Sequence, residues 1–375
     1  MIYLDYASTT PIRKEVLDTY TKILAEYYGN SDSLHEVGRK VSKVLEQSRA
    51  NIAQLLHVYN EEIIFTSCAS ESNNMAIKGF ALKNAHRGKH IITSAIEHSS
   101  VLKTMKQLEE VFGFEVTYLP VNQAGVVQTE ELRQALRKDT ILVTFMFVNN
   151  ETGAINPIEE LAKIVHEHSR AVFHCDCVQA IGKIKVDLSY MDMATFSAHK
   201  IYGLKGSGLL YKKKNIQLLP LLSGGQQELG IRAGTSNAPT HIVMAKTLRL
   251  ALEEQESSFH YVKTLNNYMR EQLTKMQDVV INSDRACSPF ILNISCLRVG
   301  SEIMLNALNA KGFAVSAQST CSSKSKARSY VLLEMGLGEE RATHAIRISL
   351  SYQTTKEEVD AFIKALQEVL NDYGT

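Results

Sequence analysis

The sequence lacks the features that assign many proteins to a class by composition alone. Lysine and arginine total 41 against 40 acidic residues, so the formal net charge is +1, and no long block of like charge occurs. This balance gives little bulk attraction for nucleic acid or anionic lipid. No stretch approaches the roughly 18 apolar residues of a membrane span, and the start MIYLDYASTT is no basic segment followed by an apolar run. We therefore expect a soluble, cytoplasmic protein that binds neither nucleic acid nor membranes directly.

Metal and nucleotide motifs are also missing. The six cysteines include no C-x-x-C pair, so we expect neither a metal site nor a disulfide framework. No G-x-x-x-x-G-K-[ST] loop occurs, and no G-x-G-x-x-G follows the first strand, which argues against nucleotide binding. Cys175 and Cys177 flank Asp176, and strand alternation places both on the face opposite this carboxylate. We interpret these two and Cys296 as core residues, whereas Cys287 lies in a loop.

From about residue 62 the chain alternates short apolar runs with amphipathic helical patterns. The apolar runs include EIIFTS, HIITSA, FEVTYLP, TILVTFMFVNN and AVFHCDCVQ. This order predicts an α/β fold with a mostly parallel central sheet. The runs DMATFSAHK and GSGLLYKKK are joined by a loop too short for a helical crossover, so they predict an antiparallel hairpin at the end of the sheet.

The length of 375 residues suggests two domains. Long helical patterns over about 240–277 are followed by the strand patterns PFILNIS and AIRISLS, which predict a smaller C-terminal α/β domain. We predict a large domain over 15–255 and a small domain built from 1–14 and 256–375. No Pro/Gly-rich linker separates them, so we expect the two domains to pack tightly.

The segment FSAHKIYG ends an apolar strand with a serine, a histidine and a lysine within four positions. A lysine crowded by burial or by other cations loses proton affinity and can form a Schiff base. Asp176 lies at the carboxyl end of another apolar run, where open α/β sheets place ligand sites. With Lys200 nearby, the carboxylate of Asp176 suits the pyridinium nitrogen of a pyridoxal cofactor. A solvated lysine and an ordinary salt bridge are the alternatives.

Three further segments gain meaning only in combination. The stretch FTSCASESNNMAI reads as a strand, a tight turn and a helix, whose first amides with Ser70 suit a phosphate, although Ser70 alone predicts an ordinary N-cap. GIRAGTSN around Thr235 is by itself no more than a glycine turn. His98 follows the strand HIITSA, where an imidazole can stack on a planar cofactor or carry a proton, and a half-buried structural histidine is the alternative.

Together these residues resemble the cysteine desulfurases, pyridoxal-phosphate enzymes of fold type I that take sulfur from L-cysteine and leave alanine. The resemblance covers nearly the whole chain and rests on motifs in the same order. They are FTSCASESNN, IEHSSV, VNNETG, DCVQAIGKI, FSAHKIYGLKG, IRAGTSN, STCSS and IRISLS. The resemblance implies a large domain with a mostly parallel sheet and a smaller C-terminal α/β domain.

The resemblance also implies pyridoxal 5′-phosphate as cofactor and a role for each matching residue. Lys200 matches the lysine that links covalently to the cofactor, and Asp176 matches the partner of its pyridine nitrogen. His98 matches the residue that stacks on the ring, and Gln179 matches the partner of the ring oxygen. Thr235 matches a residue that reaches the phosphate of a neighbouring subunit, which implies a homodimer. The matching phosphate contacts within one subunit are Ala69, Ser70, Ser197 and His199.

Substrate and sulfur chemistry follow from the same resemblance. Asn150 and Arg347 match residues that hold the carboxylate of L-cysteine, Arg347 through its planar fork. Cys321 matches the catalytic cysteine, and the cations that follow it in VSAQSTCSSKSKARS favour its thiolate form. We expect Lys200 and His98 to be the acid and base, and Cys321 to take the substrate sulfur as a persulfide.

Some positions depart from the family pattern, and alternatives stay open. Cys68 and Ala198 stand where glycines are usual, so the backbone at Cys68 cannot need a conformation that only glycine adopts. The chain ends soon after the helical pattern KEEVDAFIKALQEVLNDY, which favours a tRNA-thiolating enzyme over an iron–sulfur scaffold as sulfur acceptor. The alternatives are another fold type I lyase or aminotransferase, or a partner-binding homologue that has lost catalysis.

Overall fold

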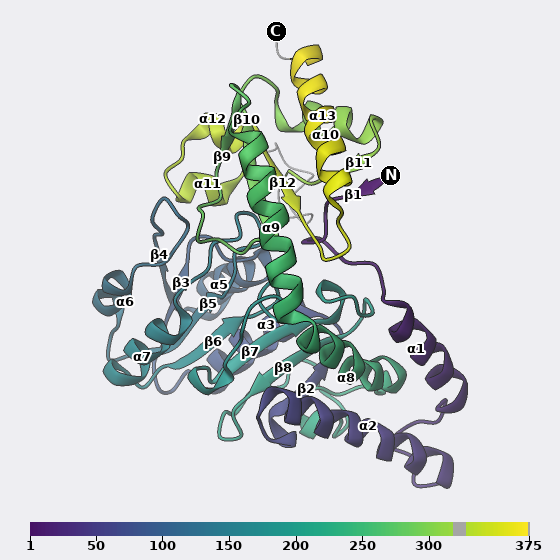
Figure 1. The fold of residues 1–375 in the computed structure, drawn as a ribbon. Helices are drawn as coiled ribbons and strands as arrows, with labels where there is room; N and C mark the ends of the chain where they lie inside the picture. The colour runs from purple at the N-terminus through teal and green to yellow at the C-terminus, as the bar shows by residue number, and fades with distance from the viewer. Residues whose placement is uncertain (318–327, 374–375) are drawn as a thin grey trace.

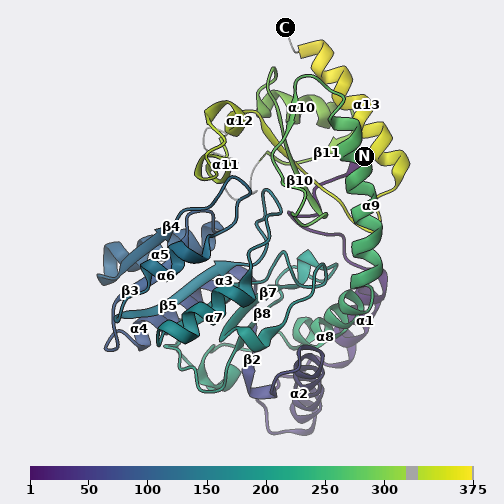
Figure 2. The same cartoon turned by 60° about the vertical axis from the view of Figure 1, so that its left-hand side comes forward.

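The computed structural model describes residues 1–317 and 328–373. These residues form a larger part around a seven-stranded sheet and a smaller part around a three-stranded sheet (Figure 1). Helix α9 (Gln255–Leu273) runs from the larger part to the smaller one, and the turned view shows the same arrangement (Figure 2).

The seven-stranded sheet is mostly parallel. Its strands, in spatial order, are β2 (Ile63–Thr66), β8 (Gly208–Lys212), β7 (Met193–Ser197), β6 (Val172–Asp176), β5 (Thr140–Met146), β3 (His90–Ser94) and β4 (Glu115–Leu119). From β7 to β4 all neighbours pair in parallel, whereas β8 is antiparallel to both β7 and β2. The expected antiparallel β7–β8 pair is therefore confirmed. Its expected place at the end of the sheet is wrong, because β2 pairs with the outer edge of β8.

Alternating residues of these strands point to opposite faces of the sheet and pack into two separate hydrophobic cores, as expected for a sheet that is buried on both faces. One core contains Phe65, Ile92, Val143 and Phe173, and the other contains their neighbours Ile64, Ile91, Leu142 and Val172. Helices α2 (Glu36–Leu56), α7 (Ile158–His168) and α8 (Ala238–Glu253) contribute to the first core. Helices α4 (Phe80–Lys83) and α5 (Ser99–Phe112) contribute to the second. Cys175 and Cys177 are buried in the first core, as expected.

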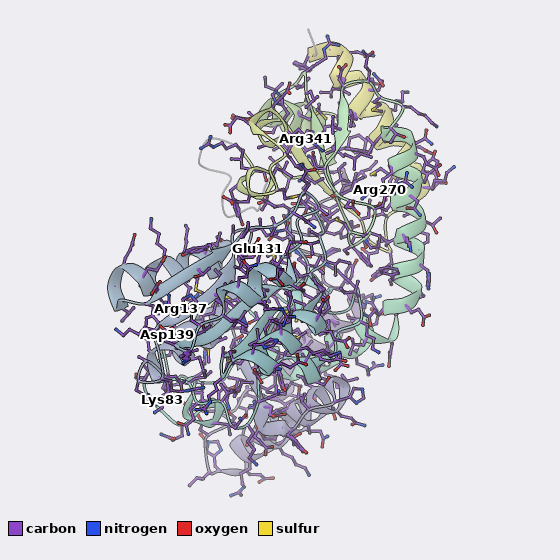
Figure 3. All side chains as sticks on the ribbon, turned by 90° about the vertical axis from the view of Figure 1, so that its left-hand side faces the viewer. Lys83, Glu131, Arg137, Asp139, Arg270 and Arg341 are labelled. Carbon is purple, nitrogen blue, oxygen red and sulfur yellow. The ribbon has the colours of Figure 1, made fainter. Side chains whose placement is uncertain are left out.

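Three more helices belong to the larger part. Helix α1 (Lys14–Glu26) packs on α8, α3 (Ala69–Asn74) follows β2, and α6 (Thr129–Ala135) packs on α7. At the outer rim of the sheet, the Arg137 guanidinium donates to the Asp139 carboxylate at 2.8 Å, and the stick view shows this pair near the sheet edge (Figure 3).

The smaller part has its own core. Its sheet places β10 (Ile291–Cys296) between β9 (Val279–Ile281) and β12 (Ala345–Ser349), with antiparallel pairing on both sides. The N-terminal strand β1 (Ile2–Tyr3) pairs with β11 (Phe313–Ala314). The core joins Leu4 to apolar residues of α9, α10 (Ser301–Ala310) and α13 (Lys356–Tyr373), and Cys296 is buried in it. The exact domain boundaries given above stay a prediction.

Two short helices connect the small part to the large sheet. Helices α11 (Tyr330–Glu334) and α12 (Glu339–Thr343) pack around Ile96, which follows β3. Of the helices in the described residues, none combines the length and apolar character needed to cross a membrane.

Candidate active site

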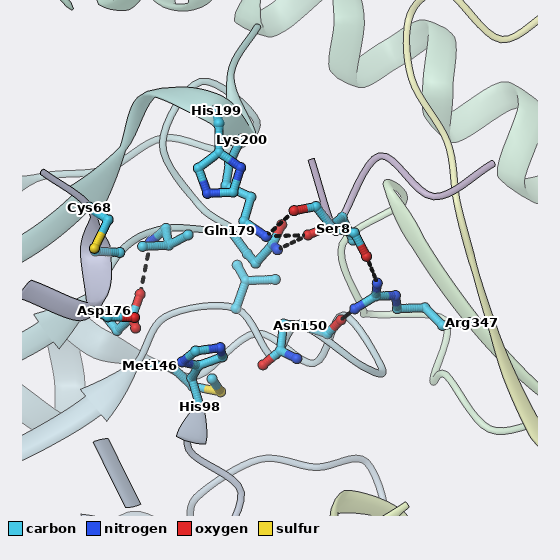
Figure 4. A pocket seen from close by; sticks show the side chains of 15 residues that line it. Ser8, Cys68, His98, Met146, Asn150, Asp176, Gln179, His199, Lys200 and Arg347 are labelled. Atoms are coloured by element: carbon cyan, nitrogen blue, oxygen red, sulfur yellow. Dashed lines mark hydrogen bonds between the residues drawn. The ribbon is translucent and has the colours of Figure 1, made fainter. Parts of the chain in front are cut away.

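The carboxyl ends of six of the seven strands lie at one edge of the large sheet, because only β8 runs in the opposite direction. Asp176 ends β6, and Lys200 comes three residues after the end of β7. His98 follows β3, and Asn150 follows β5. All four line one cavity of about 190 Å³, together with Arg347 from the small sheet (Figure 4). Sequence reasoning therefore brought together residues that lie up to 249 positions apart (347 minus 98).

Lys200 contacts the N-terminal segment of the chain, by which we mean residues 4–10, after β1. Its Nζ donates hydrogen bonds to the backbone oxygens of Ala7 and Ser8, at 2.6 and 2.7 Å (Figure 4). Both residues line the cavity. No role was predicted for Ala7 or Ser8 from the sequence, because a contact made by a backbone oxygen leaves no signal in the residue type.

Asp176 is buried and accepts two hydrogen bonds. Its Oδ1 accepts from the backbone N–H of Val178 at 3.0 Å, and its Oδ2 accepts from Nδ2 of Asn73 at 2.8 Å. These two donors hold the carboxylate in one orientation at the edge of the cavity. Asn73, on α3, was not singled out from the sequence.

His98 forms the N-cap of α5, where its Nδ1 accepts from the backbone N–H of Ser100 at 3.1 Å. Burial lowers the pKa of His98; nearby Asp176 raises it, and nearby Lys200 lowers it. The imidazole is thus favoured in its neutral form, which suits both stacking and proton acceptance. His98 can cap α5 and also act in the site, because the cap uses only Nδ1 while the ring lines the cavity.

Arg347 is only 1% exposed and crosses from β12 into the cavity. Its Nη1 donates to the backbone oxygen of Asn150 at 2.8 Å. Its Nη2 donates to Oδ1 of Asp5 at 2.9 Å. The same Nη2 donates to Oγ of Ser8 at 2.6 Å (Figure 4). The guanidinium therefore ties the end of β5 and the N-terminal segment to the small sheet.

The expected phosphate contacts are only partly gathered in the cavity. Ala69, Ser70 and His199 line it, whereas Ser197 lies fully buried beside it at the end of β7. The N-cap of α3 is Cys68, so the alternative that Ser70 is an N-cap is wrong. Cys68 has φ −171°, an extended conformation open to any residue, as expected from its replacing a glycine.

Burial also shifts the pKa of His199, the second histidine that lines the cavity. The pKa of His199 is lowered to about 4, mainly by burial and then by Lys200, Lys205 and Lys183. A neutral His199 can still donate one N–H to a phosphate oxygen. Its Nδ1 lies 3.2 Å from Oγ1 of Thr9, which is again part of the N-terminal segment.

Comparison with known proteins identifies the family. Residues 2–362 match the family described as Aminotransferase class-V. The chain is 42% identical to the cysteine desulfurase IscS of Dictyoglomus turgidum, over 100% of this chain and 95% of the relative. A solved NifS-like protein has a TM-score of 0.93 at 37% identity and covers 99% of both chains. A protein named SspA, solved in complex with cysteine, has a TM-score of 0.83 at 33% identity, over 95% of this chain and 100% of that one.

The chain belongs to the class-V aminotransferase family, among its cysteine desulfurases. This family depends on pyridoxal 5′-phosphate, and the likeness to a NifS-like structure confirms the expected fold type I. Polar atoms of this class-V aminotransferase fit such a cofactor. Ser197 Oγ and Asn150 Oδ1 are buried without a hydrogen-bond partner among the described residues. The Ser197 hydroxyl is a donor that suits a phosphate oxygen, whereas the Asn150 oxygen can only accept and suits an N–H or O–H group of a bound molecule.

Of the remaining expected residues of this family member, one does not line the cavity and one cannot be placed. Thr235 is exposed and does not line it, which is compatible with the expected contact to a neighbouring subunit. Cys321 lies outside the described residues. The segment that follows is held at Ser329, whose Oγ donates to Oε2 of buried Glu151 at 2.6 Å.

Two buried ionisable residues beside the cavity were missed from the sequence. Burial raises the pKa of Glu97 to about 8, although hydrogen bonds from Ser94 and from the backbone of Met146 oppose this shift. Burial, followed by the charges of Lys200 and Arg347, lowers the pKa of Lys183 to about 7. Glu97 directly precedes His98 in IEHSSV, and Lys183 comes four positions after Gln179 in DCVQAIGKI, so membership of these motifs is the signal that could have found them.

Proposed function

We propose that the protein converts L-cysteine to L-alanine and stores the released sulfur as a persulfide on Cys321. The observation that carries this proposal is the convergence of Lys200, Asp176 and Arg347 on one cavity, in a chain of the cysteine desulfurase family. Lysine and carboxylate suit the two ends of a pyridoxal ring, and the guanidinium suits the carboxylate of an amino acid.

Each residue has a distinct task in this proposal. Bound pyridoxal 5′-phosphate supplies an electron sink for the substrate carbon that carries the amine. Lys200 anchors the cofactor and then moves the proton at the substrate Cα, while His98 stacks on the ring and takes the proton of the substrate thiol. Arg347 and Asn150 orient the substrate carboxylate. Gln179 donates to the ring oxygen, and Ala69, Ser70, Ser197 and His199 bind the phosphate.

The sulfur step balances without an external oxidant. The Cβ–S bond of L-cysteine breaks, and an S–S bond forms between that sulfur and Cys321. The Cβ carbon is reduced from the thiol-bearing methylene of L-cysteine to the methyl group of alanine, while the transferred sulfur is oxidised to the persulfide level. The proton lost by the Cys321 thiol is balanced by the one gained at Cβ.

The test is to measure alanine and protein-bound persulfide formed from L-cysteine by the purified, cofactor-loaded protein. We expect wild type to form both products and Cys321→Ala to form neither while retaining the visible absorption of the cofactor. The matched control is Cys287→Ala, which removes another loop thiol and should leave both products unchanged. Mass spectrometry then locates the extra sulfur on the peptide that contains Cys321.

Two outcomes would contradict the proposal in different ways. Full activity of Cys321→Ala would indicate another fold type I lyase, because such a reaction does not need this thiol. A wild-type protein that binds the cofactor but forms no alanine from L-cysteine would indicate a partner-binding homologue without catalysis.

The acceptor is proposed to be a second protein, and the functional unit a homodimer in which Thr235 reaches the neighbouring phosphate. The exposure of Thr235 supports the second part. Transfer of radiolabelled sulfur from the loaded protein to a tRNA-thiolating enzyme, compared with an iron–sulfur scaffold, distinguishes the two acceptor classes. Sedimentation of the holoenzyme tests the dimer.

A further inference from the structure

Lys183 is a buried lysine at the edge of the cofactor cavity to which the proposed chemistry assigns no task. It is 8% exposed and follows β6 in a helical turn, with hydrogen bonds from Ile181 N–H to Cys177 O and from Ile184 N–H to Ala180 O. Residues four apart in such a turn lie on the same side. Lys183 therefore lies beside Gln179, and its Nζ donates to Oε1 of Gln179 at 2.6 Å.

The backbone at this turn leaves little freedom for Lys183 to move away. Gly182 has φ +69°, the left-handed region that favours glycine. A Cβ at this position would lie 2.9 Å from Cβ of Ala251 on α8, so the turn packs directly against that helix. The position of Lys183 is thus set by close packing as well as by its hydrogen bond.

The two contacts of Gln179 determine which way its amide points. Oε1 accepts from Lys183, and Nε2 donates to the backbone oxygen of Ala7 at 2.9 Å. A carbonyl oxygen can only accept, so the amide nitrogen must face Ala7, which also accepts from Lys200. Nε2 carries two hydrogens, and Ala7 takes one of them. The side of Gln179 toward the cavity is therefore a donor, which suits the ring oxygen of the cofactor.

A purely structural role does not account for a lysine in these surroundings. The charged groups that act on its pKa are two cations, Lys200 and Arg347, and burial acts in the same direction. A buried amine among cations costs stability, and perturbed groups of this kind concentrate at functional sites. His199 is also within range of its charge, since Lys183 contributes to lowering the pKa of that histidine. Further ionisable groups share a small second cavity with Lys183 and Lys200, namely Tyr6, Arg13, Tyr202, Glu254 and Tyr352.

We propose that Lys183 is a positioning residue for the cofactor site, because its amine fixes the amide of Gln179 with the nitrogen toward Ala7 and the cavity. This inference rests on the proposed use of pyridoxal 5′-phosphate. Without Lys183, Oε1 loses its donor, the amide can rotate, and a carbonyl oxygen can face the ring oxygen. Two acceptors then oppose each other and cofactor binding weakens.

The test compares Lys183→Met with Lys185→Met, an exposed lysine two positions along the same segment. For each apoprotein we measure the dissociation constant for pyridoxal 5′-phosphate and the wavelength of its visible band once bound. We expect Lys183→Met to weaken binding about fivefold, as for loss of one buried hydrogen bond, and to shift the band. Lys185→Met should match wild type in both measurements.

A double-mutant cycle with Gln179→Ala shows whether Lys183 acts through Gln179. In the Gln179→Ala background, Lys183→Met should weaken binding less than about twofold and leave the band where Gln179→Ala alone placed it. Thermal unfolding of every variant shows that the chain is folded. Lys183→Leu, which likewise has neither charge nor donor, provides the same comparison if the methionine variant does not fold.

The outcomes separate this inference from the proposed function. If wild type binds pyridoxal 5′-phosphate without forming a visible band, the proposed function is wrong and the inference falls with it. If wild type forms the band but the folded Lys183→Met or Lys183→Leu variant matches Lys185→Met, only the inference is wrong. An effect of Lys183→Met that persists in full without Gln179 would also overturn it.

Discussion

The two sides of the cavity hold their side chains by different means. On the cofactor side, Lys200, Asp176 and His98 follow the ends of parallel strands, so the sheet itself brings them together. On the substrate side, Arg347 comes from the small sheet and is held by Asp5 and Ser8 of the N-terminal segment. The cofactor side is therefore set by one sheet, whereas the substrate side depends on how the two parts of the chain pack.

This difference predicts that variants on the two sides will fail in different ways. Variants on the cofactor side should change the spectrum of the bound cofactor. Variants on the substrate side should change the concentration of L-cysteine that is needed and leave the spectrum as it is.

The largest effect is expected for Lys200→Ala. Loss of the covalent anchor and of the proton-transferring amine should lower kcat/KM for alanine formation by about a thousandfold or more. The visible band of the cofactor should change in position. The matched control is Lys205→Ala, an exposed lysine in the same loop. Wild-type turnover of Lys200→Ala would contradict the proposed role of Lys200 as cofactor anchor and proton-transferring group.

A smaller effect is expected for Arg347→Lys on the substrate side. The variant keeps a positive charge but loses the planar fork, so KM for L-cysteine should rise roughly 10- to 100-fold. The visible band without substrate should stay unchanged. Steady-state kinetics and absorption spectra check both parts.

Arg341→Lys is the control for this variant, because Arg341 contacts Ile281 and Asn282 in the small part instead of the cavity (Figure 3). If Arg347→Lys altered the cofactor spectrum as strongly as a cofactor-side variant, the result would contradict the expectation that substrate-side variants leave this spectrum unchanged.

The smallest effect concerns stability and involves Glu97 on the cofactor side. Its folded pKa of about 8 exceeds the ordinary 4.5, so between these values the folded protein holds a proton that the unfolded chain has released. Wild-type stability from this group is therefore present at low pH and lost as pH rises toward 8. The side chain introduced by Glu97→Gln does not titrate, so the variant lacks this loss. Between pH 5.5 and 8, the free energy of unfolding of wild type should therefore fall by roughly 3 kcal/mol relative to that of Glu97→Gln.

Chemical denaturation at the two pH values measures this difference. Glu131→Gln makes the same chemical change at an exposed position and should follow the pH dependence of wild type. An unchanged difference between Glu97→Gln and wild type across this range would mean that Glu97 is ionised in the folded protein.

Sequence reasoning reached the cofactor side more completely than the substrate side. Lys200, Asp176 and His98 each lie at or just after the end of an apolar run, and parallel strands bring such positions to one edge. Asn150, on the substrate side, was assigned only through the family resemblance. Arg347 was placed only through the family resemblance, because nothing in its own strand pattern points to the large sheet. Ala7 acts through its backbone oxygen and Asn73 through a tertiary contact with Asp176, so neither was predicted.

The order of strands shows the same limit. Two neighbouring runs and their short loop were enough to predict the antiparallel pairing of β7 and β8. The position of β2 at the outer edge of β8 could not be predicted in this way, because the two strands are more than 140 residues apart along the chain (208 minus 66 is 142). Local patterns carry no information about which distant edge a strand will join.

The sequence by itself determined the fold class, the alternation of elements and the residue types at the strand ends, because apolar periodicity and motif order are local properties. Only the tertiary structure decided which charges meet. Burial set the pKa of Glu97 and Lys183, and packing of the N-terminal segment brought Ala7 to Lys200 and Asp5 to Arg347. Desolvation and long-range contacts depend on the surroundings that the whole chain creates, and no single stretch of sequence contains them.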